Sequence, residues 1–176
     1  MSEDWRTKAV LISIRPKWCN LIALGKKTIE VRKTAPKLKT PFKCYIYETK
    51  GKVTIARCGE NGYRYQEGRS GVIGEFVCDK IYEIKNVGYA FKVGETGAET
   101  NAVARASCLD FTDMHDYLGR KGGYGWHISD LVIYDTPKKL SDLRLYNTSA
   151  VIEHGLPMPT HEIKSPPQSW CYVREE

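Results

Sequence analysis

The segment LGKKTIEVRK, residues 24–33, carries four basic side chains and a single acid around a short β-branched stretch. Lys27 can neutralise a phosphate, while Arg32 can bind one through two N–H groups or stack on a base. Glu30 can accept a hydrogen bond from the amino group of a base. These three side chains therefore form a candidate binding site.

The same residues also have a purely structural explanation. Lys26 and Lys27 follow a predicted helix end, where a cation stabilises the helix dipole by about 0.3–1 kcal/mol. Glu30 and Arg32 would then be an exposed ion pair worth about 0–1 kcal/mol. Residue types alone leave both interpretations open.

Strand alternation decides which of these side chains can meet. Ile29 and Val31 fall on one face of a strand, while Glu30 and Arg32 fall on the other. Lys27 has the opposite parity to Glu30. The three charged groups can therefore converge only if Lys27 lies in the turn before the strand.

A strand, a helix and a second strand are expected to position these residues. KAVLISI, residues 8–14, has the β-branched composition of a buried strand. Pro16 suits the first turn of a helix that carries Trp18 on its apolar face, and Gly25 suits the position after its end. PFKCYIYET, residues 41–49, predicts another strand, with Tyr45 and Tyr47 on one face.

The rest of the chain predicts more strands than helices. GVIGEFVCDKIYEI, residues 71–84, is expected to form one long strand, and GWHISDLVIYD and SWCYV are expected to form two more. DFTDMHDYLG predicts a short helix capped by Asp110 or Thr112 and ended by Gly119. We therefore expect a single α+β domain over residues 1–176: a strongly bent sheet or small β-barrel of five to six strands with short helices at its rims.

Composition limits the class of protein and its partners. The net charge of +6 and the pI of about 8.9 favour an anionic partner such as RNA or a phosphate-bearing small molecule, although an ordinary basic protein has the same values. The six cysteines and four histidines lack metal-binding spacing, so we expect no metal and no cofactor. The sequence shows no secretory signal and no membrane-spanning stretch, which predicts a cytoplasmic protein. The oligomeric state stays open.

The segment GKKTIEVR matches the G-x-K-x-x-E-x-R signature of the ASCH family, with Gly25, Lys27, Glu30 and Arg32 at its four positions. The flanking strands resemble that family in order, and residues 50–70 and 85–107 resemble inserted loops. The resemblance implies a PUA-like β-barrel that binds RNA or a nucleotide-like ligand in a cleft between the first helix and the barrel. Ligand-binding candidates are Lys27, Glu30, Arg32, Trp18, Tyr45, Tyr47 and Trp126.

Two alternatives follow from the same resemblance. One branch of the family hydrolyses N4-acetylcytidine with a lysine, a threonine and a glutamate. Lys27 matches the lysine, but Glu30 occupies the threonine position, and Glu75 would have to serve as the glutamate. A hydrolase or ribonuclease would then use Lys27 and Glu30, with Glu75 and His127 as further catalytic candidates. The other alternative is a protein-interaction adaptor that uses residues 85–107.

Overall fold

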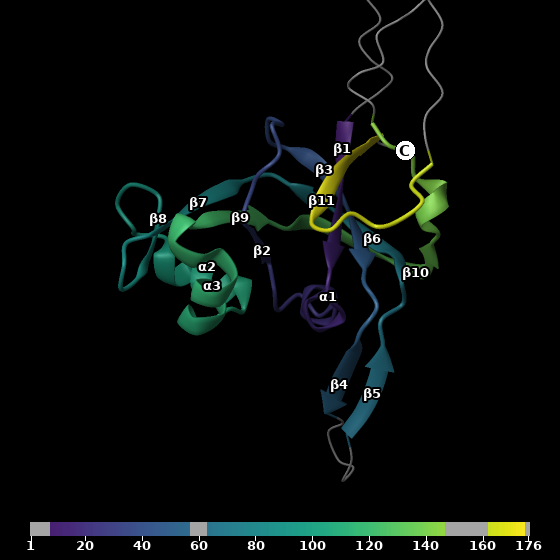
Figure 1. Cartoon of the computed structure of the whole chain (residues 1–176), viewed down its shortest axis with the longest axis horizontal. Helices are drawn as coiled ribbons and strands as arrows, with labels where there is room; N and C mark the ends of the chain where they lie inside the picture. The colour runs from purple at the N-terminus through teal and green to yellow at the C-terminus, as the bar shows by residue number, and fades with distance from the viewer. Residues whose placement is uncertain (1–7, 57–62, 147–161, 175–176) are drawn as a thin grey trace, which may run out of the picture. The chain divides into compact units, whose positions relative to one another are not determined.

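The computed structural model describes residues 8–56, 63–146 and 162–174 (Figure 1). These residues form two compact units. The first contains the described residues up to Cys19, from Lys43 to Glu75 and from Val132 onward; the second contains Asn20–Phe42 and Phe76–Leu131. Each unit contains its own sheet and its own hydrophobic core.

The five-stranded sheet belongs mainly to the first unit. β1 pairs parallel with β3 and antiparallel with β11, and the full order is β10-β6-β3-β1-β11. Its strands are β1 (Lys8–Ile14), β3 (Phe42–Glu48), β6 (Gly71–Cys78), β10 (Ser129–Lys138) and β11 (Trp170–Arg174). Six of the seven β1 residues are buried, as the β-branched composition of that segment predicts.

A long hairpin, β4 (Lys52–Ala56) and β5 (Tyr63–Glu67), extends from this unit (Figure 1). It occupies the segment predicted to be an inserted loop at residues 50–70. The expected turn at Glu60–Gly62 lies outside the described residues. The short 3-10 helix η2 (Leu140–Asp142) follows β10.

The four-stranded sheet of the second unit has the order β2-β9-β7-β8. Its strands are β2 (Ile29–Arg32), β7 (Ile81–Asn86), β8 (Phe91–Val93) and β9 (Gly123–His127). Helices α2 (Thr100–Ser107) and α3 (Phe111–Leu118) lie on one face of this sheet, and the 3-10 helix η1 (Gly119–Lys121) follows α3 (Figure 1). Val103 and Met114 from the helices pack there against Ile29 and Val31 from β2.

The helix that precedes the charged segment is α1 (Pro16–Ala23), as predicted. Its buried residues are Pro16, Cys19 and Ile22, while Trp18 is only partly buried. Gly25 has φ +68°, in the left-handed region that a side chain disfavours, which explains why a glycine ends this helix.

Several sequence-based expectations need correction. Residues 71–84 form two strands, because the chain turns at Asp79 and Lys80, and residues 123–138 also divide in two at Ile128. The region 85–107, expected to be mostly loop, contains β8 and helix α2. The described residues contain eleven strands, and their pairing gives two open sheets and a hairpin, so a closed barrel is not confirmed. The α+β class holds.

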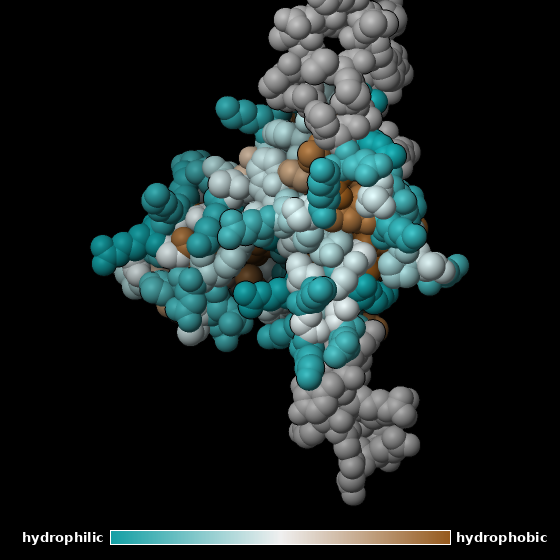
Figure 2. All heavy atoms as spheres, turned by 45° about the vertical axis from the view of Figure 1, so that its right-hand side comes forward, coloured by the Kyte–Doolittle hydropathy of each residue, from teal (hydrophilic) through white to brown (hydrophobic). Residues whose placement is uncertain are grey.

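Most of the face drawn in Figure 2 is hydrophilic, with small hydrophobic areas. Among the described residues, the large hydrophobic side chains that are clearly exposed are Leu24, Val87, Tyr89, Phe111, Tyr117 and Val132. Within the described ranges, no helix is long and apolar enough to cross a membrane.

Candidate functional site

Three charged side chains of the second unit meet at the carboxylate of Glu30. Lys27 Nζ lies 3.3 Å from one carboxylate oxygen and Arg32 Nη2 lies 3.0 Å from the other. The exposed fractions of the residues are 2% for Lys27, 5% for Glu30 and 7% for Arg32. We call these three residues the charged cluster. Its burial excludes the interpretation of Glu30 and Arg32 as a solvated surface pair.

Local structure explains why three residues of mixed parity converge. β2 begins at Ile29, so Lys27 lies before the strand and its side chain is not bound to strand alternation. The backbone N–H groups of Lys26 and Lys27 both donate to Leu21 O at the end of α1, which fixes the turn. The condition that the sequence sets for convergence is therefore met.

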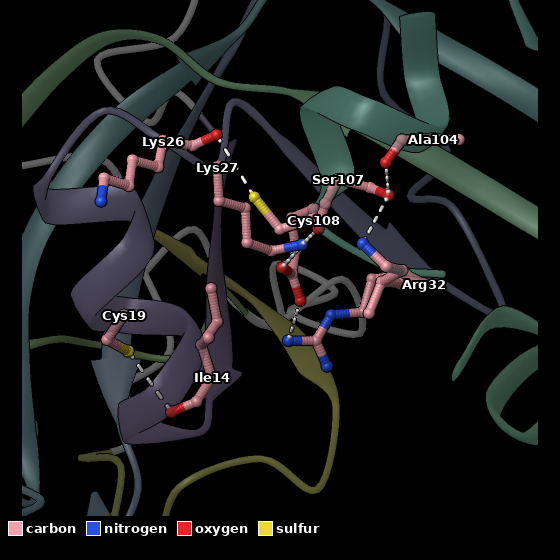
Figure 3. A network of polar contacts seen from close by, with 10 residues as sticks. Ile14, Cys19, Lys26, Lys27, Arg32, Ala104, Ser107 and Cys108 are labelled. Carbon is pink, nitrogen blue, oxygen red and sulfur yellow. Dashed lines mark hydrogen bonds and ion pairs between the residues drawn. The ribbon is translucent and has the colours of Figure 1, made fainter. Parts of the chain in front are cut away.

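Helix α2 closes one side of the cluster. Lys27 Nζ donates to the backbone carbonyl of Ser107, the last residue of α2, at 2.6 Å (Figure 3). Carbonyls at a helix C-terminus lack intrahelical partners and carry partial negative charge, so a cation is favourable there. Ser107 itself is fully buried. Cys108 adds a contact from its Sγ to Lys26 O at 3.3 Å, which ties the helix end to the same turn.

The cluster is energetically demanding. Moving a charge from water to a protein interior costs several kcal/mol, which is offset only by close partners with good geometry. Here two cations share one carboxylate, so the three side chains carry a formal charge of +1. Lysine and arginine side chains with this excess positive charge favour binding of an anion. The carboxylate between them can accept a hydrogen bond from an amino group.

The aromatic candidates have packing roles. Trp126 pairs in register with Glu30 across β9 and β2, but it is fully buried and packs edge-on against Phe42 at 6.0 Å. Tyr45 and Tyr47, in the first unit, are 0% and 7% exposed and belong to the hydrophobic core of that unit. We therefore assign these three rings to the core, where they offer no free face for stacking.

Trp18 and Glu75 lie in other surroundings. Trp18, in the first unit, is partly buried, with Lys17 Nζ 4.4 Å from its ring. Glu75 accepts a hydrogen bond from Tyr134 and lies 3.3 Å from Lys43 Nζ. Burial raises the pKa of Glu75, but these bonds outweigh that effect and hold its pKa below the usual value. Glu75 and its partners thus form a separate polar group within the first unit.

His127 has a carboxylate of its own. Its Nδ1 lies 2.6 Å from Asp79 Oδ1, and the hydrogen bond holds the pKa of Asp79 below its usual value. Residues facing each other across a ladder share a face. His127 pairs with Ile29, so it belongs to the face opposite to that of Glu30. The structure therefore does not bring His127 to the charged cluster.

Sequence reasoning missed two buried polar contacts, one at the charged cluster and one in the first unit. Ser107 acts through its backbone carbonyl, which no side-chain pattern can reveal, and helix α2 itself had been expected to be a loop. Glu48, only 4% exposed, accepts from the backbone N–H and from Nε of Arg69, both at 2.8 Å, and so fastens the chain after β5 to the end of β3. Nothing in the sequence around Glu48, at the end of β3, indicated that it forms a buried ion pair.

Comparisons with known proteins agree with the signature. Residues 12–95 match the model of the ASCH domain. The crystal structure of ASCH from Zymomonas mobilis has a TM-score of 0.56 and 19% identity, over 95% of this chain and 88% of that one. A tyrosine-to-phenylalanine mutant of the same protein gives a TM-score of 0.57 and 19% identity, over 96% of this chain and 92% of that one. No curated protein matches.

The structural likeness, at this low identity, supports the fold. The family match supports the signature, because all four signature positions from Gly25 to Arg32 lie within the matched residues. The part of the chain that holds the charged cluster therefore lies within the segment that matches the ASCH domain.

Proposed function

We propose that this chain is a binding module for RNA or a nucleotide-like ligand, with the charged cluster as the binding site. The observation that carries the proposal is the meeting of Lys27 and Arg32 on Glu30, all three nearly buried. The net charge of +6 supports an anionic partner.

Each member of the cluster has a defined role in this proposal. Lys27 neutralises a phosphate, while Arg32 presents a planar fork to a phosphate or a base edge. Glu30 accepts from an exocyclic amino group and also holds the two cations in place. Because the groups are held by one another before the ligand arrives, little ordering cost is left for binding. A ligand can reach the cluster only where these side chains are exposed, so the small exposed part of each side chain must face the ligand.

The test is the affinity for a short single-stranded RNA of mixed sequence, measured by fluorescence anisotropy over a salt series. Arg32→Lys keeps the charge and removes the fork, and Lys27→Gln removes one charge. We expect weaker binding for both, and for Lys27→Gln a salt slope that falls by about one phosphate contact. Lys33→Gln is the matched control, since Lys33 is exposed and loses the same charge. Equal affinities for the parent and both cluster variants would overturn the proposal.

A hydrolase acting on a modified nucleoside is the second function, and the 3.3 Å contact between Lys27 and Glu30 favours it. A lysine beside a carboxylate can transfer protons when substrate displaces one partner. Incubation with N4-acetylcytidine, followed by chromatography of the products, tests it. Turnover that Lys27→Gln abolishes would make the site catalytic. If the folded parent leaves N4-acetylcytidine unchanged, the hydrolase function is excluded and only the binding function remains.

A further inference from the structure

An open cavity of about 470 Å³ lies in the second unit, apart from the charged cluster. It is lined by Asn86 and Gly88 at the turn between β7 and β8, His115 on α3, and Arg120 on η1. Two chain segments thus form the walls: the turn between β7 and β8, and the continuous stretch from α3 to η1.

Hydrogen bonds hold those walls together. Asn86 Oδ1 accepts from Gly88 N at 2.8 Å, and Asn86 Nδ2 donates to Gly119 O at 2.9 Å. The amide therefore fixes the hairpin turn with one end and the start of η1 with the other. Gly88 has φ +93°, a conformation that favours glycine and keeps this wall free of a side chain.

Exposed aromatic side chains accompany two of the lining residues, His115 and Gly88. Phe111 is 49% exposed, with its centroid 6.0 Å from that of His115 at an interplanar angle of 30° and 5.5 Å from that of Phe91. Tyr89, next to Gly88 in the chain, is 89% exposed. Exposed apolar side chains that gather in one patch, unlike single scattered ones, mark interaction sites.

Arg120 supplies a cation to the cavity wall. Arg120 and Lys121 are both exposed, and within the described ranges Arg120 makes no ion pair. His115 has a carboxylate neighbour, with Asp116 Oδ1 3.7 Å from its Nδ1. A guanidinium beside flat rings suits a phosphate joined to a base, because the cation binds the anion and the rings stack on the base.

We propose that this cavity and the Phe111–His115 stack bind a segment of single-stranded nucleic acid, with a phosphate at Arg120 and a base on that stack. Tyr89 favours a strand over a free nucleotide, because it offers a second exposed ring next to Gly88 in the chain. The inference adds a second contact surface to the proposed function and does not depend on the charged cluster.

The test is again anisotropy with a short single-stranded RNA of mixed sequence, now with surface variants. Phe111→Leu keeps an apolar side chain and removes the ring, and we expect about fivefold weaker binding, the lower end of what one stacked base contributes. Arg120→Gln should weaken binding and reduce the salt slope by about one phosphate contact. Phe111→Tyr should bind as the parent does.

Two controls share the unit and the chemistry of these variants. Tyr117→Ala removes an exposed ring from the same helix, six residues along and on a different flank. Arg105→Gln removes an equal charge from α2. Both should bind as the parent does, and circular dichroism should show all variants folded.

Three results would overturn the inference. The first is parent-like affinity for both Phe111→Leu and Arg120→Gln; if Lys27→Gln still weakens binding, the proposed function stands without this surface. The second is equal weakening by the two controls. The third is competition by adenosine monophosphate at the concentration at which the strand itself competes, because the ligand would then be a free nucleotide.

Discussion

Replacing Glu30 with glutamine tests whether the carboxylate holds the charged cluster together. The change keeps the shape of the side chain and removes its charge. Lys27 Nζ at 3.3 Å and Arg32 Nη2 at 3.0 Å would then face a neutral amide while remaining at most 9% exposed. Removing one partner of a buried ion pair destabilises a protein by about 3–5 kcal/mol.

This loss is large for a chain of 176 residues. At about 2–4 °C per kcal/mol for this size, the melting temperature should fall by about 6–20 °C. Urea denaturation followed by circular dichroism would give the change in unfolding free energy. Glu95→Gln is the matched control, since Glu95 pairs with Lys85 at 2.9 Å but its side chain is 88% exposed, and we expect little measurable change.

A double-mutant cycle measures the coupling energy between Lys27 and Glu30 separately from their other interactions. Lys27→Met removes one cation, and in that background Glu30→Gln should cost less than in the parent. Neighbouring charges typically give a coupling of about 0.5–3 kcal/mol. The reasoning is refuted if Glu30→Gln melts with the parent, or if the two substitutions are additive.

Three further predictions concern other parts of the fold. A Cβ at Gly74 would lie 2.3 Å from Val132 O, so Gly74→Ala should lower the unfolding free energy by about 1–3 kcal/mol in urea titrations. The hydrogen bond from His127 depresses the pKa of Asp79, so it stabilises the fold at pH values above the unfolded pKa of Asp79. This contribution is lost as the pH falls through the folded pKa. Asp79→Asn should therefore flatten the acid limb of a plot of melting temperature against pH. Burial raises the pKa of Cys78 to about 12, so mass spectrometry should find Cys78 unlabelled by iodoacetamide at pH 8 until urea is added.

Local rules accounted for the elements near the charged cluster. Pro16, the spacing of the apolar residues and Gly25 predicted helix α1, and alternation correctly assigned Ile29 and Val31 to the core face. Asp110 caps α3 through a 2.7 Å hydrogen bond from Asp113 N, and Gly119 ends the helix, as expected. Each of these features depends on residues a few positions apart, which is why sequence patterns could reveal them.

Features that depend on distant contacts were predicted less well. Residues 71–84 look like one strand because Asp79 and Lys80 are a weak turn signal between two apolar runs. Helix α2 has a small, polar sequence, TNAVARAS, and is stabilised by packing of Val103 against the sheet of its unit. Tertiary packing of this kind commonly overrides local propensity. The role of the Ser107 carbonyl was not predicted either, because it depends on where α2 packs and not on a local sequence pattern.

The most direct test of the binding proposal is nuclear magnetic resonance of the arginine Nε–H and lysine Nζ groups during titration with the short single-stranded RNA. The account predicts shifts of the Arg32 and Lys27 signals that saturate with the anisotropy curve. Arg69, whose Nε is held by Glu48 in the first unit, serves as the internal control and should not move. Saturable binding with the Arg32 and Lys27 signals unchanged would contradict the account.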